Sequence, residues 1–276
     1  MGQAARIAGL AAPLAALVML IFGAATAAEI DDLYQGQTIV TGEREETRGP
    51  GFAECLEDVL VKVSGDPRLI GDPRVAEMAK QAGIMVGEFR YHDRMAGIPH
   101  HDEQGTRDRP YDLIVRFEKA KIDAALRSLG RAPWTASRPR IVVFLGMRNL
   151  LASYMLAEDG DRALEHEALV AAAARRGVPL MLPSRAALEQ AGVSFESLPA
   201  ADLARLDAAA QAMGGDRALV GRMAWSDEAM SWVADWRLRS ADETEQWQVR
   251  SLTFDDGFRK ALGGAAQILS GNGPPS

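Results

Sequence analysis

The segment Asp216–Leu252, which reads DRALVGRMAWSDEAMSWVADWRLRSADETEQWQVRSL, decides the fold. It predicts three consecutive β-strands, separated by polar turns at Ser226–Glu228 and Ser240–Glu243. The second strand alternates between apolar and polar residues, and its apolar residues are Met230, Trp232, Ala234, Trp236 and Leu238. Because successive side chains of a strand point to opposite faces of the sheet, we expect these five on one buried face. Trp247 and Val249 of the third strand continue that face, so the sheet is expected to hold a core.

The residues before this segment predict strands that alternate with helices. Ile141–Leu145 is a continuous apolar run, typical of a central strand covered on both faces. It is followed by a helix over about Ala163–Arg176, a strand at Val178–Leu182, and a helix with Leu203, Leu206, Ala210 and Met213 facing inward. Strands joined through helices pair in parallel with right-handed crossovers. We therefore expect an α/β unit over residues 140–270, with a mixed sheet of parallel strands and then an antiparallel meander, flanked by helices, the last of which is capped by Thr253.

Residues 29–130 predict a smaller α+β unit with the order β-α-α-β-β-α. Its expected elements are a strand at Gln37–Thr41, a helix from Phe52 that ends before Ser64–Pro67, a helix that begins at Asp72-Pro73, strands at Val86–Tyr91 and Tyr111–Phe117, and a helix carrying Ile122, Ala125, Leu126 and Leu129. Gly49–Gly51 is expected to break the chain before the first helix. Residues 131–139 read as a connector in which Trp134 packs back onto a domain, and residues 271–276 as a disordered tail.

Composition places the chain among ordinary globular proteins. It has 276 residues, 47% of them hydrophobic and 25% charged, with a formal net charge of −7. An acidic chain without a basic stripe lacks the charge needed to neutralise phosphates along a nucleic acid. We therefore expect no nucleic-acid partner.

The N-terminal residues predict export. Arg6 is followed by the nearly unbroken apolar run Ile7–Phe22 and then by Ala25–Ala27, which has the small residues of a cleavage site. A basic start, a short apolar core and an Ala-x-Ala exit are typical of a secretory signal peptide. We expect residues 1–27 to be removed and the mature protein to be periplasmic. The alternative is an uncleaved anchor, since Ile7–Ala28 is just long enough to span a bilayer.

No residue pattern predicts catalysis, a metal or a cofactor. Cys55 is the single cysteine and lies on the apolar stripe of the Phe52 helix, which favours a buried structural thiol. The cluster His100–Glu103, with His92 and Asp93 upstream, lacks the spacing of a metal site and is interpreted as a solvated loop. Gly-x-Ser-x-Gly and Gly-rich phosphate-loop motifs are also missing from the sequence.

One edge of the second unit offers a possible ligand site. In open α/β sheets, ligands bind beyond the carboxyl ends of the parallel strands. Arg148 follows the first of these strands, and Ser184 and Arg185 follow the second. Two arginines there would suit a carboxylate or phosphate, although ordinary loop charges fit the same pattern.

Several stretches resemble a bacterial envelope family, domain of unknown function 2066. They are Val59–Asp66, Arg90-Tyr91, Leu129-Gly130, Pro133-Trp134, Arg138-Pro139, Arg176–Leu180, Asp216–Arg222 and Phe254–Gly257. The element order of the second unit is also similar to the small α/β domain of TolB and of CsgG-type proteins. These resemblances imply an envelope location and a binding or assembly role, and they assign no catalytic residue.

Two classes of function follow from the sequence. The first is a non-enzymatic periplasmic binding or adaptor protein whose partner is another envelope protein. The alternative is a small-anion-binding protein or enzyme that uses Arg148, Ser184 and Arg185. A third version is the same module held at the membrane by its uncleaved N-terminal segment.

Overall fold

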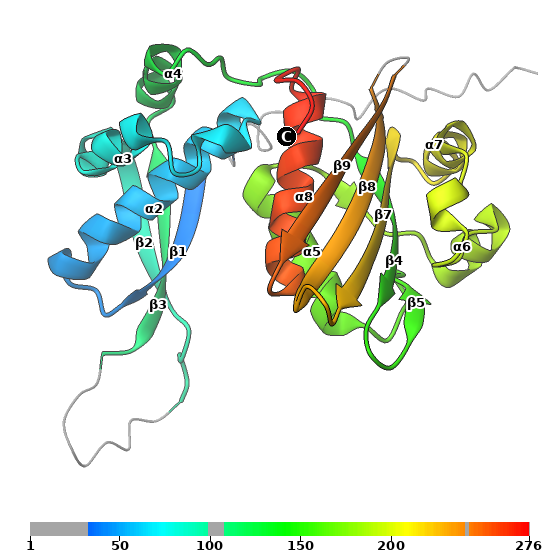
Figure 1. The fold of residues 1–276 in the computed structure, drawn as a ribbon. Coiled ribbons are helices and arrows are strands. Elements are labelled where there is room, and N and C mark those ends of the chain that lie inside the picture. Colours follow the sequence, from blue (N-terminus) through cyan, green and yellow to red (C-terminus); the bar gives the residue numbers. More distant parts are fainter. Residues whose placement is uncertain (1–32, 99–107, 241–242, 276) are drawn as a thin grey trace, which may run out of the picture.

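The computed structural model describes residues 33–98, 108–240 and 243–275. It confirms the predicted fold class, with a small α+β unit and a second unit whose mixed sheet is flanked by helices (Figure 1). The buried residues of the part up to Leu129 form one core, and those from Trp134 onward form two others. We refer to these parts as the N-terminal and C-terminal units.

The C-terminal unit contains a six-stranded sheet. Its strands are β4 (Ile141–Arg148), β5 (Ser153–Met155), β6 (Leu180–Met181), β7 (Arg217–Ser226), β8 (Ser231–Ser240) and β9 (Glu243–Ser251). The order is β5-β4-β7-β8-β9, and the short β6 also pairs with β4. β4 is parallel to β6 and β7, whereas β8 and β9 continue as an antiparallel meander, as the sequence predicts.

The tryptophan-rich strands have the predicted register, with one exception. Trp236 of β8 lies opposite Trp247 of β9, and both are buried. Met230 was expected on the same face, but it is 67% exposed and lies in the turn before β8 with a φ of 47°. The strand begins only at Ser231, so the alternation does not extend to Met230. Trp232 is half-buried at the end of the face, where its ring contacts Trp225 and Phe254.

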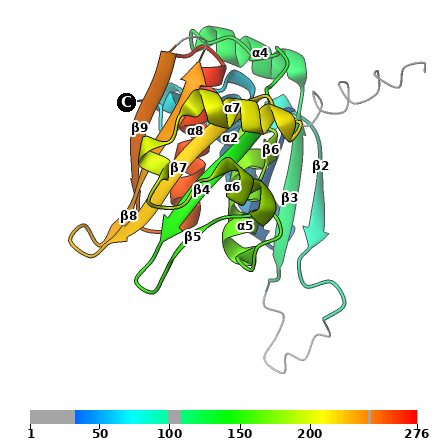
Figure 2. The ribbon, with the colours of Figure 1, turned by 90° about the vertical axis from the view of Figure 1, so that its right-hand side faces the viewer.

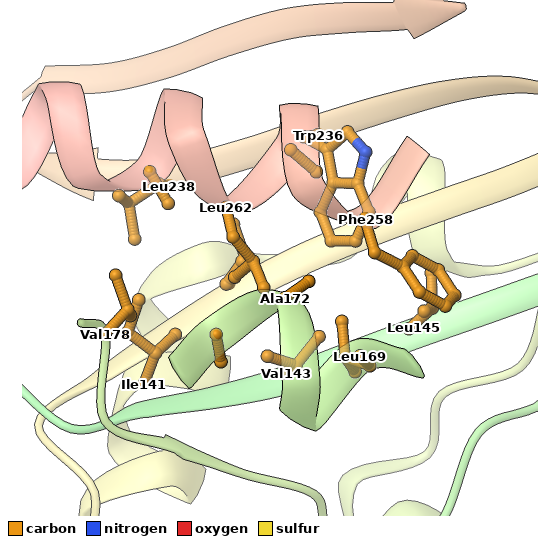
Figure 3. Packing of buried hydrophobic residues seen from close by; sticks show 14 of the residues in the cluster. Ile141, Val143, Leu145, Leu169, Ala172, Val178, Trp236, Leu238, Phe258 and Leu262 are labelled. Carbon is orange, nitrogen blue, oxygen red and sulfur yellow. The ribbon is translucent and has the colours of Figure 1, made fainter. Parts of the chain in front are cut away.

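Helices cover this sheet on both faces, which makes three layers (Figures 1 and 2). They are α5 (Ala163–Arg176) and α8 (Phe254–Leu269) on one face and α6 (Arg185–Ala191) and α7 (Leu203–Ala212) on the other. Figure 3 shows Trp236 and Phe258 between the sheet and α8, beside Leu262. β4 is buried along its length from Ile141 to Met147, because it has helices on both sides.

Three short elements of the C-terminal unit are not in the sequence-based prediction. β5 and α6 have three and seven residues, and the 3-10 turn Leu198–Ala200 has three, so none carries a long periodic pattern. α6 has a recognisable start, because the Ser184 hydroxyl accepts a hydrogen bond from the Ala187 amide. The strand expected at Val178–Leu182 is reduced to two paired residues.

The N-terminal unit packs helices onto one face of a three-stranded antiparallel sheet of order β1-β3-β2. Its elements are β1 (Gln35–Thr41), α2 (Glu45–Ser64), the 3-10 turn Pro67–Leu69, α3 (Pro73–Ala79), the 3-10 turn Ala82–Met85, β2 (Val86–Asp93), β3 (Pro110–Phe117) and α4 (Lys119–Ser128). The predicted order β-α-α-β-β-α is confirmed. Asp72 caps α3 through the Arg74 amide, as its sequence indicates.

The predicted break at Gly49–Gly51 is wrong. α2 already begins at Glu45 and continues through Pro50. The missing Pro50 amide affects only the exposed first turns, because the buried part of the helix starts at Gly51. A Cβ at Gly51 would lie 2.6 Å from Leu113 and 2.9 Å from Val40. Gly51 therefore serves close packing of α2 on the sheet, not a chain break.

The connector is fixed to the N-terminal unit, and so is the chain end. Trp134 is buried, and its amide donates to the Val63 carbonyl at 2.7 Å. The disordered tail expected at 271–276 differs from the structure, in which Asn272 Nδ2 donates to the Ser64 carbonyl at 2.9 Å. Gln267 Nε2 also holds the Pro274 carbonyl at 2.8 Å, so residues 271–275 are bound to both units. The predicted signal peptide lies outside the described residues, within which no helix is long and apolar enough to cross a membrane.

Gly221 tests how tightly the tryptophan face is packed. A Cβ at this position would lie 2.3 Å from the Trp236 ring, which is fully buried. We expect Gly221→Ala to lower the free energy of unfolding by about 1–3 kcal/mol through overpacking. Urea unfolding followed by tryptophan fluorescence measures this change. The control is Gly49→Ala, where nothing lies within 4 Å; equal stability losses in both variants would contradict the packing explanation.

Candidate functional site

A buried ionic cluster joins the two units. Asp58 of α2 accepts from Arg175 Nη2 at 2.5 Å and from Arg176 Nη1 at 3.3 Å, both at the C-terminal end of α5. Asp58 and Arg176 are 7% and 5% exposed. Burial lowers the pKa of Arg176, as does the charge of Arg175, whereas Asp58 opposes this shift. A guanidinium so far from water requires its carboxylate, so this cluster fixes α5 against α2.

Arg138 of the connector reinforces the same joint. Its guanidinium donates to the carbonyls of Gly177 at 2.9 Å and Lys62 at 2.7 Å, which follow α5 and lie in α2. It also lies 4.0 Å from the ring centroid of Trp134. Gly177 has a φ of 61°, and a Cβ there would lie 2.9 Å from both Arg138 and Leu33. One arginine thus satisfies the ends of two helices from different units.

A groove of about 1040 Å³ opens beside this joint. It lies between β1, α2 and α5, so both units contribute walls. One wall is the strand segment Gln35–Ile39, and the opposite wall contains Ala171 and Ala174 of α5. Asp58, Lys62 and further charged residues of both units form the rest. In Figure 1, β1 is the strand of the N-terminal sheet nearest the C-terminal unit.

The groove contains an edge of the sheet. Among the described residues, β1 pairs with β3 on one side, and no strand pairs with its other side. The Tyr34 carbonyl accepts from Phe117, and the Gly42 amide donates to Arg109, so the even-numbered residues of β1 direct their backbone groups to β3. The N–H and C=O groups of Gln35, Gln37, Ile39 and Thr41 therefore point to the outer edge. Lys62 Nζ donates to the Gln35 carbonyl at 2.8 Å. The outward backbone groups of Gln37 and Ile39, in the groove wall, have no partner within the part of the chain that the structure describes.

The side chains around this edge combine apolar and paired polar groups. Ile39 is 56% exposed, and Thr38 donates to Glu54 Oε2 at 2.7 Å. Arg94 lies 3.6 Å from Asp112 at the outer face of the sheet. These polar side chains are bound to one another. The groove therefore presents the outward main-chain groups of β1 beside the apolar side chains of Ile39, Ala171 and Ala174.

A separate apolar surface lies at one end of the C-terminal sheet. Leu150 and Leu151, in the β4–β5 turn, are 73% and 93% exposed. Met230 in the β7–β8 turn and Leu252 after β9 are also exposed. The strand register places these turns at the same end of the sheet, and Figure 2 shows the β4–β5 and β7–β8 turns there. We call Leu150, Leu151, Met230 and Leu252 the apolar end.

The three predicted ligand residues have different partners. Arg148 ends β4 and lies 4.9 Å from the Phe195 ring centroid. Ser184 caps α6, and Arg185 lies 3.6 Å from Asp161, while its amide donates to Asp159. The second strand ends beside the first half of β4, so its loop does not lie level with Arg148. The sequence argument assumed that the two parallel strands end at the same edge of the sheet. The two-residue β6 instead ends beside Val142, near the start of β4.

The remaining reactive side chains have structural surroundings. Cys55 is fully buried, and this burial, with the charges of Asp58 and Glu54, raises the pKa of its thiol to about 12. His166 is 3.4 Å from Glu158, and His92 is 3.4 Å from Asp112. The residues His100–Glu103 lie outside the described chain. Within the described ranges, no group of three histidine, cysteine or acidic side chains is placed to hold a metal ion.

Charged residues in two otherwise apolar helices were a sequence signal for the contact between the units, and an analysis of hydrophobic periodicity does not use it. Asp58 interrupts the apolar stripe of α2, and Arg175-Arg176 end an alanine-rich helix. A carboxylate on one buried face and arginines on another suggest a pair, but nothing in either stretch states which helix meets which.

Part of the chain is similar to a known family. Residues 27–135, less than half of the chain, match the model of a domain of unknown function (DUF8605). The resemblance to domain of unknown function 2066 is therefore wrong, because the matching model is a different one. No curated protein and no solved structure matches the chain, so the likeness to TolB and CsgG-type domains has no support. The match covers the N-terminal unit, with β1 and α2 of the groove.

Asp58 tests the joint. We expect Asp58→Asn to lower the free energy of unfolding by about 3–5 kcal/mol, because Arg176 remains buried without its carboxylate. Equilibrium unfolding in urea measures the loss. Glu57→Gln is the matched control, since its only described contact is the Gly71 amide, which a glutamine oxygen can also accept. An unchanged midpoint for Asp58→Asn would show that the pair does not hold the units together.

Proposed function

We propose that this chain is an exported, non-enzymatic periplasmic adaptor that binds an extended segment of another envelope protein along β1. The observation that carries this proposal is the open outer edge of β1 inside a groove that both units build. An extended peptide pairs with such an edge as an added strand, and its side chains enter neighbouring pockets.

Several features of the groove suit a peptide. The backbone groups of Gln37 and Ile39 repeat at the two-residue spacing that an added strand offers. Alternate side chains of that strand would contact Ile39 and the alanine face of α5, which favours small or medium apolar residues. A bound segment would also cover an edge that is otherwise open to pairing with other chains.

The apolar end gives the adaptor a second contact surface. Exposed large apolar side chains on adjacent turns are typical of protein contact sites. It belongs to the C-terminal unit alone, whereas the groove needs both units. Two surfaces on different parts of the molecule support a connecting role.

Export is supported by the sequence of residues 1–27, with its basic start, apolar core and Ala-x-Ala exit. The formal net charge of −7 gives no support to a nucleic-acid partner. Contact with the membrane remains tied to the alternative in which the N-terminal segment is retained.

The edge-pairing proposal is tested at Gln37. Gln37→Pro removes an outward N–H without removing a bond to β3, because edge strands tolerate proline in that orientation. We expect partner binding to weaken at least fivefold, from the loss of one hydrogen bond worth about 1 kcal/mol and the added ring. Photo-crosslinking from position 39 in intact cells identifies the partner, and its purified segment then provides the affinity.

Gln37→Ala is the control for this experiment, because it removes the side chain and retains the N–H. It should bind like the wild-type chain, and both variants should keep the wild-type melting temperature. Equal affinities of the proline and alanine variants would show that the partner does not pair with this edge.

Export is tested separately by the mass of the mature chain. In a bacterium that expresses the full sequence, we expect the chain in the osmotic-shock fraction with Ala28 as its first residue or close to it. An intact Met1 in the membrane fraction would instead support the anchored alternative, and an intact Met1 in the cytoplasm would remove the export proposal.

A further inference from the structure

Strand β2 forms the second edge of the N-terminal sheet. Among the described residues, it pairs with β3 and with no other strand. In Figure 1, it lies on the side of this sheet away from the C-terminal unit. This edge is therefore separate from the groove along β1, which lies at the other end of the strand order.

Phe89 and Tyr91 direct their backbone groups outward from this edge. The Arg94 amide donates to the Pro110 carbonyl at 3.3 Å, so the even-numbered residues of the paired stretch direct their backbone groups to β3. The N–H and C=O groups of Phe89 and Tyr91 point the other way, and they have no partner within the part of the chain that the structure describes. Their two-residue spacing is the one that a further strand requires.

Phe89 is also an exposed aromatic side chain at this edge. It lies on the face of the sheet that the helices cover, where its ring centroid is 5.2 Å from that of Phe52 and 5.9 Å from that of Tyr91. Arg48 of α2 lies 5.1 Å from the same centroid. The side chain is nevertheless 42% exposed, so α2 covers it only in part. An aromatic partner beyond the edge would bury the rest.

Two opposite charges flank Phe89 on the other face of the sheet. Glu88 is exposed and lies 2.9 Å from Arg116 of β3. Arg90 is exposed and forms no ion pair with a carboxylate of the described residues. The edge thus carries a negative residue, an aromatic residue and a positive residue in succession, which is a self-complementary pattern for an antiparallel strand.

We infer that β2 pairs antiparallel with β2 of a second copy of this chain, about a twofold axis through Phe89. In a twofold contact, each residue meets on the partner the residue whose place it takes there. The two Phe89 residues then lie opposite each other, and Glu88 of each copy lies opposite Arg90 of the other. Pairs such as Glu88 and Arg90, which exchange no backbone hydrogen bonds, bring their side chains closest. The two three-stranded sheets join into one continuous sheet.

The other symmetric registers lack this complementarity. An axis through Glu88 or Arg90 places like charges directly opposite each other, which is destabilising. An axis through Tyr91 places Phe89 opposite Asp93, so neither residue gains a suitable partner. The bulge at the start of β2 and the charges along it disfavour pairing with unrelated strands. They leave the register centred on Phe89, in which both charges and both rings are matched.

The test measures the mass of the purified chain by sedimentation equilibrium, up to about 1 mM, because a contact through one strand pair is expected to be weak. We expect a reversible equilibrium of monomer and dimer. Glu88→Arg and Arg90→Glu should each weaken dimerisation roughly tenfold or more, since like charges then meet twice in the dimer. An equimolar mixture of these two variants should form a heterodimer within roughly threefold of the wild-type affinity, because both of its charge pairs are again opposite.

Glu167→Arg and Arg127→Glu are the matched controls, which reverse the same charges at exposed positions of α5 and α4 and should dimerise like the wild-type chain. A monomeric wild-type chain throughout the series overturns the inference. So does an Arg90→Glu chain that dimerises as tightly as the wild type, or a mixture of folded variants that stays monomeric. If Glu88→Arg does not fold, because it loses its pair with Arg116, Arg90→Glu alone decides. The test at Gln37 is independent, because β1 stays exposed in this dimer.

Discussion

The arrangement of the two units depends on one buried carboxylate between two arginines. Asp58 pairs with the buried Arg176 and with the partly exposed Arg175, and removal of Asp58 leaves the Arg176 charge buried without a carboxylate. Such a cluster need not add much net stability over an apolar contact, but its ion pairs are satisfied in this alignment of α2 and α5. Arg138 adds directional hydrogen bonds at the ends of the same two helices. The groove between the units depends on this alignment.

Helix α8 connects the tryptophan face to this joint. Its apolar side, with Phe258 and Leu262, packs on the sheet beside Trp236. Two successive glycines allow α8 to approach both units closely. A Cβ at Gly263 would lie 3.4 Å from Pro67 of the N-terminal unit, and one at Gly264 would lie 2.7 Å from Trp247 of β9. One helix thus seals the C-terminal core and contacts the N-terminal unit. The bound chain end, through Asn272, strengthens this second contact.

Most of the fold could be predicted from the sequence, because its long elements carry clear periodicity. The strands of Asp216–Leu252 alternate, and α5 and α8 have helical apolar spacing with recognisable ends. The errors occur at residues whose type fits two different structural roles. Gly51 was interpreted as a break but permits close packing, and Met230 matched the alternation although it belongs to the turn. Short elements such as β6 and α6 are set by tertiary pairing, which periodicity does not report.

The candidate sites were not predictable in the same way, because they arise between units. Arg148, Ser184 and Arg185 were chosen from one unit's strand order, whereas the groove needs residues more than a hundred positions apart, such as Asp58 and Arg175. These two side chains also hold the units together, so the same contact that builds the groove wall fixes its width. A segment bound along β1 that contacts α5 would therefore stabilise the joint, and by thermodynamic linkage a stronger joint would favour its binding.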